Sequence, residues 1–113
     1  MIGTLSQPFG LTLATLFARV KRFDQAHAWF IRALNKEPQG IVLCRIYVGL
    51  AQTEFQRCHF LNARHYAKLC LEQMAQGAVA ESEPQAMQLL EEASWYYQSS
   101  AEEALKHRRR ALQ

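Results

Sequence analysis

The side chains best suited to metal binding or nucleophilic chemistry in this 113-residue chain are four histidines and three cysteines. They are His27, His59, His65, His107, Cys44, Cys58 and Cys70. No histidine and cysteine have the spacing of a zinc finger, and the HExxH pattern of zinc proteases is absent. Cys58 and His59 are adjacent, but neighbouring side chains on a helix point about 100° apart. The sequence therefore predicts no metal site.

The cysteines also indicate a reducing cellular compartment. Their number is odd and they include no CxxC pair, which disfavours a disulfide framework. The first ten residues lack the basic and apolar regions of a signal peptide. No run approaches the roughly 18–20 apolar residues that a membrane span needs. We therefore expect a cytoplasmic protein without a membrane span.

Two pairs of acidic residues, Glu91–Glu92 and Glu102–Glu103, could in principle act in acid–base chemistry. That chemistry needs carboxyl groups that face each other across a cleft, which neighbours on one helix do not do. We interpret both pairs as solvated faces that contact cations three or four residues further along. No glycine-rich phosphate loop and no GxSxG motif is present. The sequence predicts a protein that is not an enzyme and that binds no cofactor.

The basic run Lys106–Arg110 could contact RNA, an anionic membrane or an acidic protein. However, cations in the last turns of a helix are also favoured by the helix dipole. No aromatic residue is interleaved with the arginines to stack on bases, and the net charge of the chain is only +3. Nucleic-acid binding is therefore not the preferred interpretation. A structural or nucleic-acid-associated module that uses this basic helix remains the alternative function.

Composition favours an all-α fold. Alanine, leucine, glutamine, glutamate and arginine are plentiful, whereas β-branched residues, glycine and proline are sparse. The length fits one domain, so we treat residues 1–113 as a single helical domain. Apolar spacing and helix-stop residues predict a first helix over about 8–20 and, after a short turn at 21–24, a second from near Asp24 to about 36. A third helix should begin near 41 and carry apolar residues as far as Phe55, and residues 60–74 should form the core of a fourth.

A fifth helix should begin at about Pro84, after a capping box formed by Ser82 and Gln85. It should run at least to Ser99 and bury its large apolar residues. These are Met87, Leu90 and Trp95, with help from Tyr96 or Tyr97. Residues 101–112 are also strongly helical. They either continue the fifth helix as one long cap or form the second half of a third helix pair.

Residues 11–38 carry a set of apolar and small positions typical of a helix–turn–helix pair. They are Leu13, Ala14, Phe17, Phe23, Ala26, Phe30, Ala33 and the closing Pro38. This set resembles the tetratricopeptide repeat, in which small alanines let two helices approach and aromatic residues fill the gaps beside them. Two positions depart from the family pattern. Gly10 stands where the family usually has tryptophan, and Lys21 stands in place of the turn glycine.

A second, degenerate repeat overlays the first with an offset of 37 residues. Leu50, Ala51, Phe60, Ala63 and Cys70 match Leu13, Ala14, Phe23, Ala26 and Ala33. The resemblance thus implies an antiparallel helix-pair solenoid of five to six helices. Its first repeat would span about residues 7–40 and its second about 41–77. A cap or a degenerate third repeat would follow over about 83–113.

The resemblance also implies a partner-binding groove lined by the first helix of each pair. Transfer of the family's concave positions gives Leu11, Thr15, Ala18, Arg19, Val48, Gln52 and Phe55. We expect this surface to be mostly apolar with a single cation. Leu11 and Thr15 replace the lysine and asparagine of the family's chaperone-tail clamp. The surface should therefore bind a helical or extended apolar segment rather than an acidic tail.

The expected function is that of a non-catalytic scaffold or adaptor for another protein. By architecture, the chain is also similar to the small repeat chaperones of bacterial secretion systems. About three stacked units are the usual minimum for a stable array, and two repeats plus a terminal element meet it narrowly. A partner protein, in a homo- or hetero-oligomer, could supply the missing buried surface.

Overall fold

The computed structural model describes residues 9–75 and 83–112, which form five α-helices and no strand. The helices are α1 (Phe9–Arg19), α2 (Phe23–Leu34), α3 (Gly40–Gln56), α4 (Phe60–Ala75) and α5 (Glu83–Leu112). The prediction of an all-α fold is therefore confirmed. The expected start of the first helix at Pro8 and the Ser82 side of the expected capping box lie outside the described residues. No helix within 9–75 and 83–112 has both the length and the apolar character needed to cross a bilayer.

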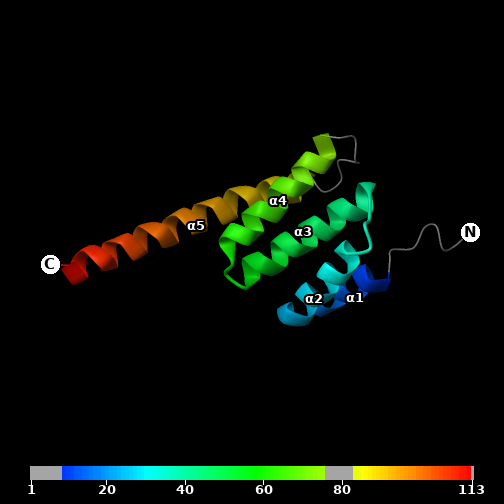
Figure 1. The fold of residues 1–113 in the computed structure, drawn as a ribbon, viewed down its shortest axis with the longest axis horizontal. Helices are drawn as coiled ribbons and strands as arrows, with labels where there is room; N and C mark the ends of the chain where they lie inside the picture. The colour runs from blue at the N-terminus through cyan, green and yellow to red at the C-terminus, as the bar shows by residue number, and fades with distance from the viewer. Residues whose placement is uncertain (1–8, 76–82, 113) are drawn as a thin grey trace, which may run out of the picture.

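The helices pack side by side, with α3 in the centre. α1 and α2 form one antiparallel pair, α3 and α4 form the next, and α5 packs against α4 and α3 (Figure 1). α3 contacts all four other helices. Its buried residues cover most of the circumference of the helix and leave open the side that carries Gln52 and Gln56. The molecule is elongated, 68 × 30 × 20 Å, because α5 extends far beyond the ends of α3 and α4 (Figure 1).

The turns within the two helix pairs have the same backbone geometry, 37 residues apart. The N–H of Arg22 donates to the carbonyl of Phe17 at 2.9 Å, and the N–H of His59 donates to the carbonyl of Glu54 at 2.8 Å. These hydrogen bonds close the last turn of α1 and of α3 in the manner of a Schellman motif. The backbone therefore repeats with the same offset that relates the two sequence windows.

Each of these turns depends on one residue in the left-handed region. Lys21 and Cys58 both have φ of 63°, a conformation that usually favours glycine. Lys21 occupies the position where the tetratricopeptide pattern has its turn glycine. In both turns a residue other than glycine adopts a conformation that glycine adopts most easily.

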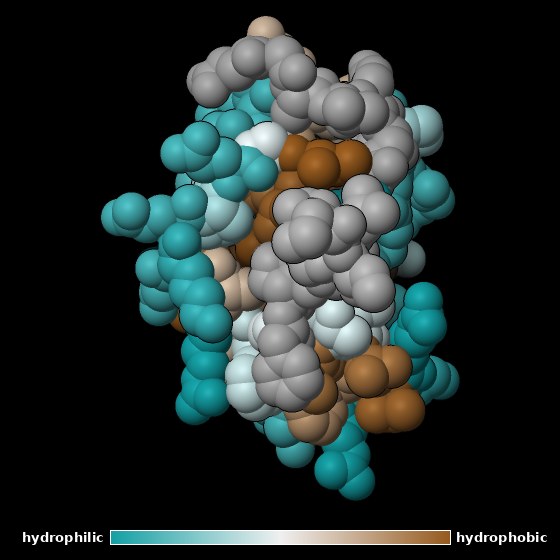
Figure 2. All heavy atoms as spheres, turned by 90° about the vertical axis from the view of Figure 1, so that its right-hand side faces the viewer, coloured by the Kyte–Doolittle hydropathy of each residue, from teal (hydrophilic) through white to brown (hydrophobic). Residues whose placement is uncertain are grey.

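The core consists of two clusters that share α3. The first cluster lies between α1, α2 and α3 and contains Leu11, Ala14, Ala26, Phe30, Ala33, Ile46 and Leu50. The second lies between α3, α4 and α5 and contains Cys44, Val48, Ala51, Ala67, Cys70, Ala86 and Leu89. The first cluster combines three alanines with four large side chains, whereas alanine and cysteine dominate the second, which allows the helix axes there to approach closely. At the end of the molecule away from the projecting part of α5, hydrophobic and polar side chains are interspersed on the surface (Figure 2).

A close contact joins α2 to α3. The ring of Phe30 lies directly over Gly49, where a Cβ atom would overlap ring atoms Cζ and Cε1. Phe30 is only 2% exposed and belongs to the first core cluster, so a shift of its ring would disturb the packing of that cluster. Gly49 therefore allows the first helix pair to pack against the second.

α5 is one continuous helix of 30 residues. Residues 101–112 therefore continue the fifth helix and do not form a separate helix of a third pair. The buried face of α5 differs from the predicted one. Met87 and Trp95 are 43% and 62% exposed, and Leu90 is half-buried. The buried residues are instead Ala86, Leu89 and Ala93. Ala67 of α4 belongs to the same core cluster as Ala86 and Leu89, and small residues on two facing helices leave no room for a tryptophan between them.

We predict that Gly49→Ala lowers the free energy of unfolding by about 1–3 kcal/mol, because the added methyl group overpacks the Phe30 contact. The alanine gains about 0.5–1 kcal/mol in helix propensity, which offsets only part of this cost. Urea unfolding followed by circular dichroism measures the difference.

Gly10→Ala is the matched control in α1. Its Cβ would meet Ala33 and Trp29 at 3.8 Å, an ordinary contact distance. Its unfolding free energy should stay the same or rise by up to about 1 kcal/mol. Equal effects of the two substitutions would contradict the close packing at Gly49.

Candidate functional site

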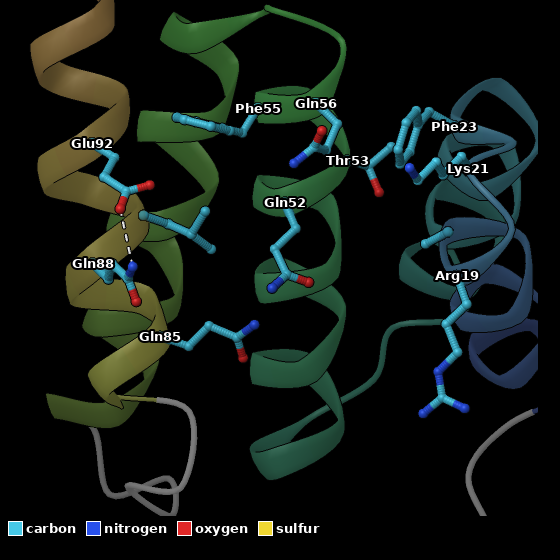
Figure 3. A pocket seen from close by; sticks show the side chains of 12 residues that line it. Arg19, Lys21, Phe23, Gln52, Thr53, Phe55, Gln56, Gln85, Gln88 and Glu92 are labelled. Atoms are coloured by element: carbon cyan, nitrogen blue, oxygen red, sulfur yellow. Dashed lines mark hydrogen bonds between the residues drawn. The ribbon is translucent and has the colours of Figure 1, made fainter.

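A concave surface on the described part of the chain lies between α1, α3 and α5. It consists of two adjoining hollows of about 550 Å³ and about 540 Å³, which we call together the groove. Both hollows are lined by Ala18, Arg19, Gln52 and Gln85, so they form one continuous surface. Figure 3 shows the first hollow, with α5 on one side, α3 in the middle and α1 with the following turn on the other.

All seven residues predicted to bind a partner lie in this groove. Leu11, Thr15 and Val48 line one hollow, Phe55 lines the other, and Ala18, Arg19 and Gln52 line both. The structure thus brings together residues from two helices that are about 30 positions apart in sequence.

Leu11 and Val48 form the floor of the groove rather than an open surface. They are 2% and 6% exposed and belong to the two core clusters. The hydroxyl of Thr15 donates to the carbonyl of Leu11 at 2.9 Å, within α1. The side chains able to reach a ligand are therefore mainly those of Arg19, Gln52 and Phe55.

The groove is more polar than predicted. Its walls carry four glutamines, Gln52, Gln56, Gln85 and Gln88, of which two belong to α5. The side chains of Gln52 and Gln85 extend toward one another across the groove (Figure 3). The expectation of a mostly apolar surface with a single cation is therefore wrong, because the apolar positions transferred from the family turn inward here and α5 adds a polar wall.

The charges on the two walls of the groove have opposite signs. Arg19 and Lys21 lie on the α1 side, and Glu92 lies on the α5 side, where it accepts a hydrogen bond from Gln88 at 3.0 Å (Figure 3). Sequence reasoning missed the α5 wall. The available signal was the spacing of Gln85, Gln88 and Glu92, which leaves them beside the buried face of α5.

A buried carboxylate stabilises the region behind the groove. Glu54, at the end of α3, is only 2% exposed. Its oxygens accept hydrogen bonds from Arg57 at 2.8 Å and from Asn62 at 2.9 Å, and they contact His59 Nδ1 at 3.1 Å. His27 of α2 lies 3.8 Å away. We call this set the carboxylate cluster. It connects α2, α3, the following turn and α4.

The cluster keeps Glu54 ionised. Burial by itself raises the pKa of this carboxyl group. The hydrogen bonds from Asn62 and His59 and the positive charge of Arg57 lower it by more, so the pKa lies below its ordinary value of 4.5. Sequence analysis did not single out Glu54. The 37-residue overlay places it at the position of Phe17, where the repeat pattern expects an aromatic residue, and this mismatch was the available signal.

The thiols are unsuited to chemistry at the groove. Cys44 and Cys70 are fully buried between α3 and α4, and each Sγ donates to the other's carbonyl, at 3.9 and 3.7 Å. Burial raises the pKa of Cys44 and raises that of Cys70 to about 12, so both stay protonated at neutral pH. Cys58 is exposed on its turn. Among the described residues, no group of histidine, cysteine and acidic side chains is placed to hold a metal ion.

Comparison with known proteins gives no assignment for this arrangement: no family model, no curated protein and no solved structure matches the chain.

We predict that Glu54→Gln lowers the free energy of unfolding at pH 7 by about 3 kcal/mol, because it removes one partner from a buried charged network. The native state holds the pKa of Glu54 below 4.5, so the unfolded chain binds the proton more tightly. The wild-type protein should therefore lose stability as the pH falls through 4.5, and Glu54→Gln should show a shallower loss. Urea unfolding over a series of pH values from 7 to 3 tests this.

Glu103→Gln serves as the control. Its carboxylate is 65% exposed and lies 3.9 Å from Lys106. Its unfolding free energy should stay within about 0.5 kcal/mol of the wild-type value, with the wild-type pH dependence. A Glu54→Gln curve parallel to that of the wild type would show that Glu54 is not the group that titrates.

Proposed function

We propose that this protein is a non-catalytic interaction scaffold whose groove holds a segment of another protein. The observation that supports this most directly is that all seven predicted partner-binding residues line one continuous groove. The tetratricopeptide resemblance supports the same function, because proteins of that family bind ligands on the corresponding surface of an antiparallel helix-pair solenoid. Adaptor, assembly subunit and small secretion-type chaperone are all roles that such a groove could serve.

The lining of the groove favours an extended segment over a helical one. Each glutamine side chain offers two donors and one acceptor, which match the N–H and C=O groups of an extended peptide backbone. The backbone of a bound helix has already used these groups within the helix. Gln52 and Gln85, on opposite walls, are placed to contact the backbone of a segment between them.

Side-chain recognition would come from three residues around the glutamines. The half-buried ring of Phe55 offers an apolar contact at one end of the groove. Arg19 would fix the register of the segment through an acidic side chain, while Glu92 on the opposite wall would disfavour acidic residues there. We therefore propose an extended segment that carries one apolar and one acidic side chain.

The test is selection of binders from a library of random 12-residue peptides on the wild-type protein, followed by affinity measurement on variants. We expect Phe55→Asp and the double variant Gln52→Ala/Gln85→Ala each to weaken the selected peptides about tenfold or more, since each removes groove contacts. Leu16→Asp and Gln25→Ala change an exposed apolar residue and an exposed glutamine outside the groove and should leave affinity unchanged. Equal binding to all four variants would refute the groove as the binding site.

Salt dependence separates this function from the alternative one that uses the basic run. Groove binding with a single ion pair should change little between 50 and 500 mM salt. Binding through Lys106–Arg110 should weaken steeply over this range and should be lost in Arg108→Glu/Arg109→Glu. Peptides that lose affinity only in that double variant would favour the alternative.

A further inference from the structure

The last twelve described residues of α5 project from the molecule without covering protein. α4 reaches α5 for the last time near Tyr96, whose ring stacks on Phe60 with centroids 5.0 Å apart, and near Tyr97, which lies under Arg64. Beyond these residues, every described side chain from 101 to 112 is exposed. We call this part of α5 the overhang. At 1.5 Å per residue it is about 18 Å long.

One side of the overhang carries an apolar stripe that starts at the bundle. Steps of three and four residues place Tyr97, Ala101, Leu105, Arg108 and Leu112 along a single side of the helix. The exposed fractions of the three large apolar side chains are 41% for Tyr97, 52% for Leu105 and 81% for Leu112. The aliphatic stem of Arg108 can lie on the stripe while its guanidinium group reaches solvent. Such spacing is typical of a helix that packs against another helix.

The order of charges beside the stripe favours a second copy of the same helix, packed antiparallel, as the partner of the overhang. Glu102 and Arg109 directly follow stripe positions Ala101 and Arg108 and are seven residues apart, so they lie on the same flank of the stripe. Neither has an ion pair among the described residues. In two antiparallel copies related by a two-fold axis at Leu105, each Glu102 would face the Arg109 of the other copy. A parallel pair would instead align the two Arg108–Arg110 runs and cause repulsion.

The ends of the paired overhangs also fit. A two-fold axis at Leu105 brings Leu112 of one copy next to residues 97–98 of the other. There, a hollow at the end of the bundle is lined by Phe60, Leu61 and Tyr97, among others. The overhang projects away from the bundle (Figure 1), so this pairing places the packed half of the second α5 at the distal end of the first overhang.

From the stripe, the charge order and the hollow we infer that the overhang is a self-association surface, on which the α5 helix of a second copy of this chain packs antiparallel with its two-fold axis beside Leu105. No residue of this surface lines the groove. The inference therefore does not depend on the proposed function, and each can fail without the other.

Disulfide cross-linking tests the orientation and the register. In a Cys58→Ser background, which removes the exposed native thiol, Leu105→Cys should form a covalent dimer on mild oxidation because the two residues 105 meet at the axis. Leu112→Cys should not, because its two copies would be about 20 Å apart at 1.5 Å per residue. Cross-linking of both variants would indicate a parallel pair, and cross-linking of neither would indicate no pair. Either result would overturn the inference.

A charge exchange tests the same interface without cysteines. Wild-type protein should sediment at twice the 13.0 kDa chain mass. Glu102→Arg alone and Arg109→Glu alone should each dimerise about tenfold more weakly, since two attractive pairs become repulsive. An equimolar mixture should form mixed dimers in preference to either homodimer, because opposite charges face each other again only in the mixed pair. A monomeric wild type at 100 µM, or mixing without preference, would refute the surface.

Discussion

The close approach of α2 to α3, where the Phe30 ring lies over Gly49, is the constraint on which the rest of the described structure depends. α3 is the only helix that contacts all four others, so its distance from α2 determines where both helix pairs lie. Had α3 been held further away by a larger residue, the first core cluster would lose contact with Ile46 and Leu50. The groove follows from the same contact, because its floor and middle wall belong to α3.

Much of the helical framework could be predicted from the sequence because its signals are local. Pro38 and Gly40 end one helix pair and start the next, and the alanine and aromatic positions recur after 37 residues. The face of α5 could not be predicted in this way. Hydrophobicity alone favours burial of Trp95 over Ala93, whereas the width of the seam against α4 permits the reverse. That width is a property of two packed helices and cannot be read from either one alone.

The residues of the candidate site also fall into a group that could be predicted from the sequence and a group that could not. The resemblance to the tetratricopeptide repeat predicted which residues of α1 and α3 line the groove, because these residues have fixed places in the repeat pattern. The wall formed by α5 and the polar character of the groove depend on how a third helix rotates against the bundle. At Glu54, the departure from the repeat pattern marks the position, but its burial as a charge depends on donors such as Arg57 and Asn62 that converge on it from separate elements. Local sequence does not reveal that convergence.

α5 connects two surfaces with different properties within one rigid element. Its first turns contribute Gln85 and Gln88 to the groove, and its last turns form the overhang. A helix of 30 residues is about 45 Å long. Antiparallel pairing of two overhangs would therefore place the two grooves at opposite ends of a rod and related by two-fold symmetry. Such a dimer would bind two segments of one elongated or repetitive partner together, with an affinity gain set by how well their spacing matches the rod. Two separate monomeric scaffolds, even with identical grooves, would not provide that gain.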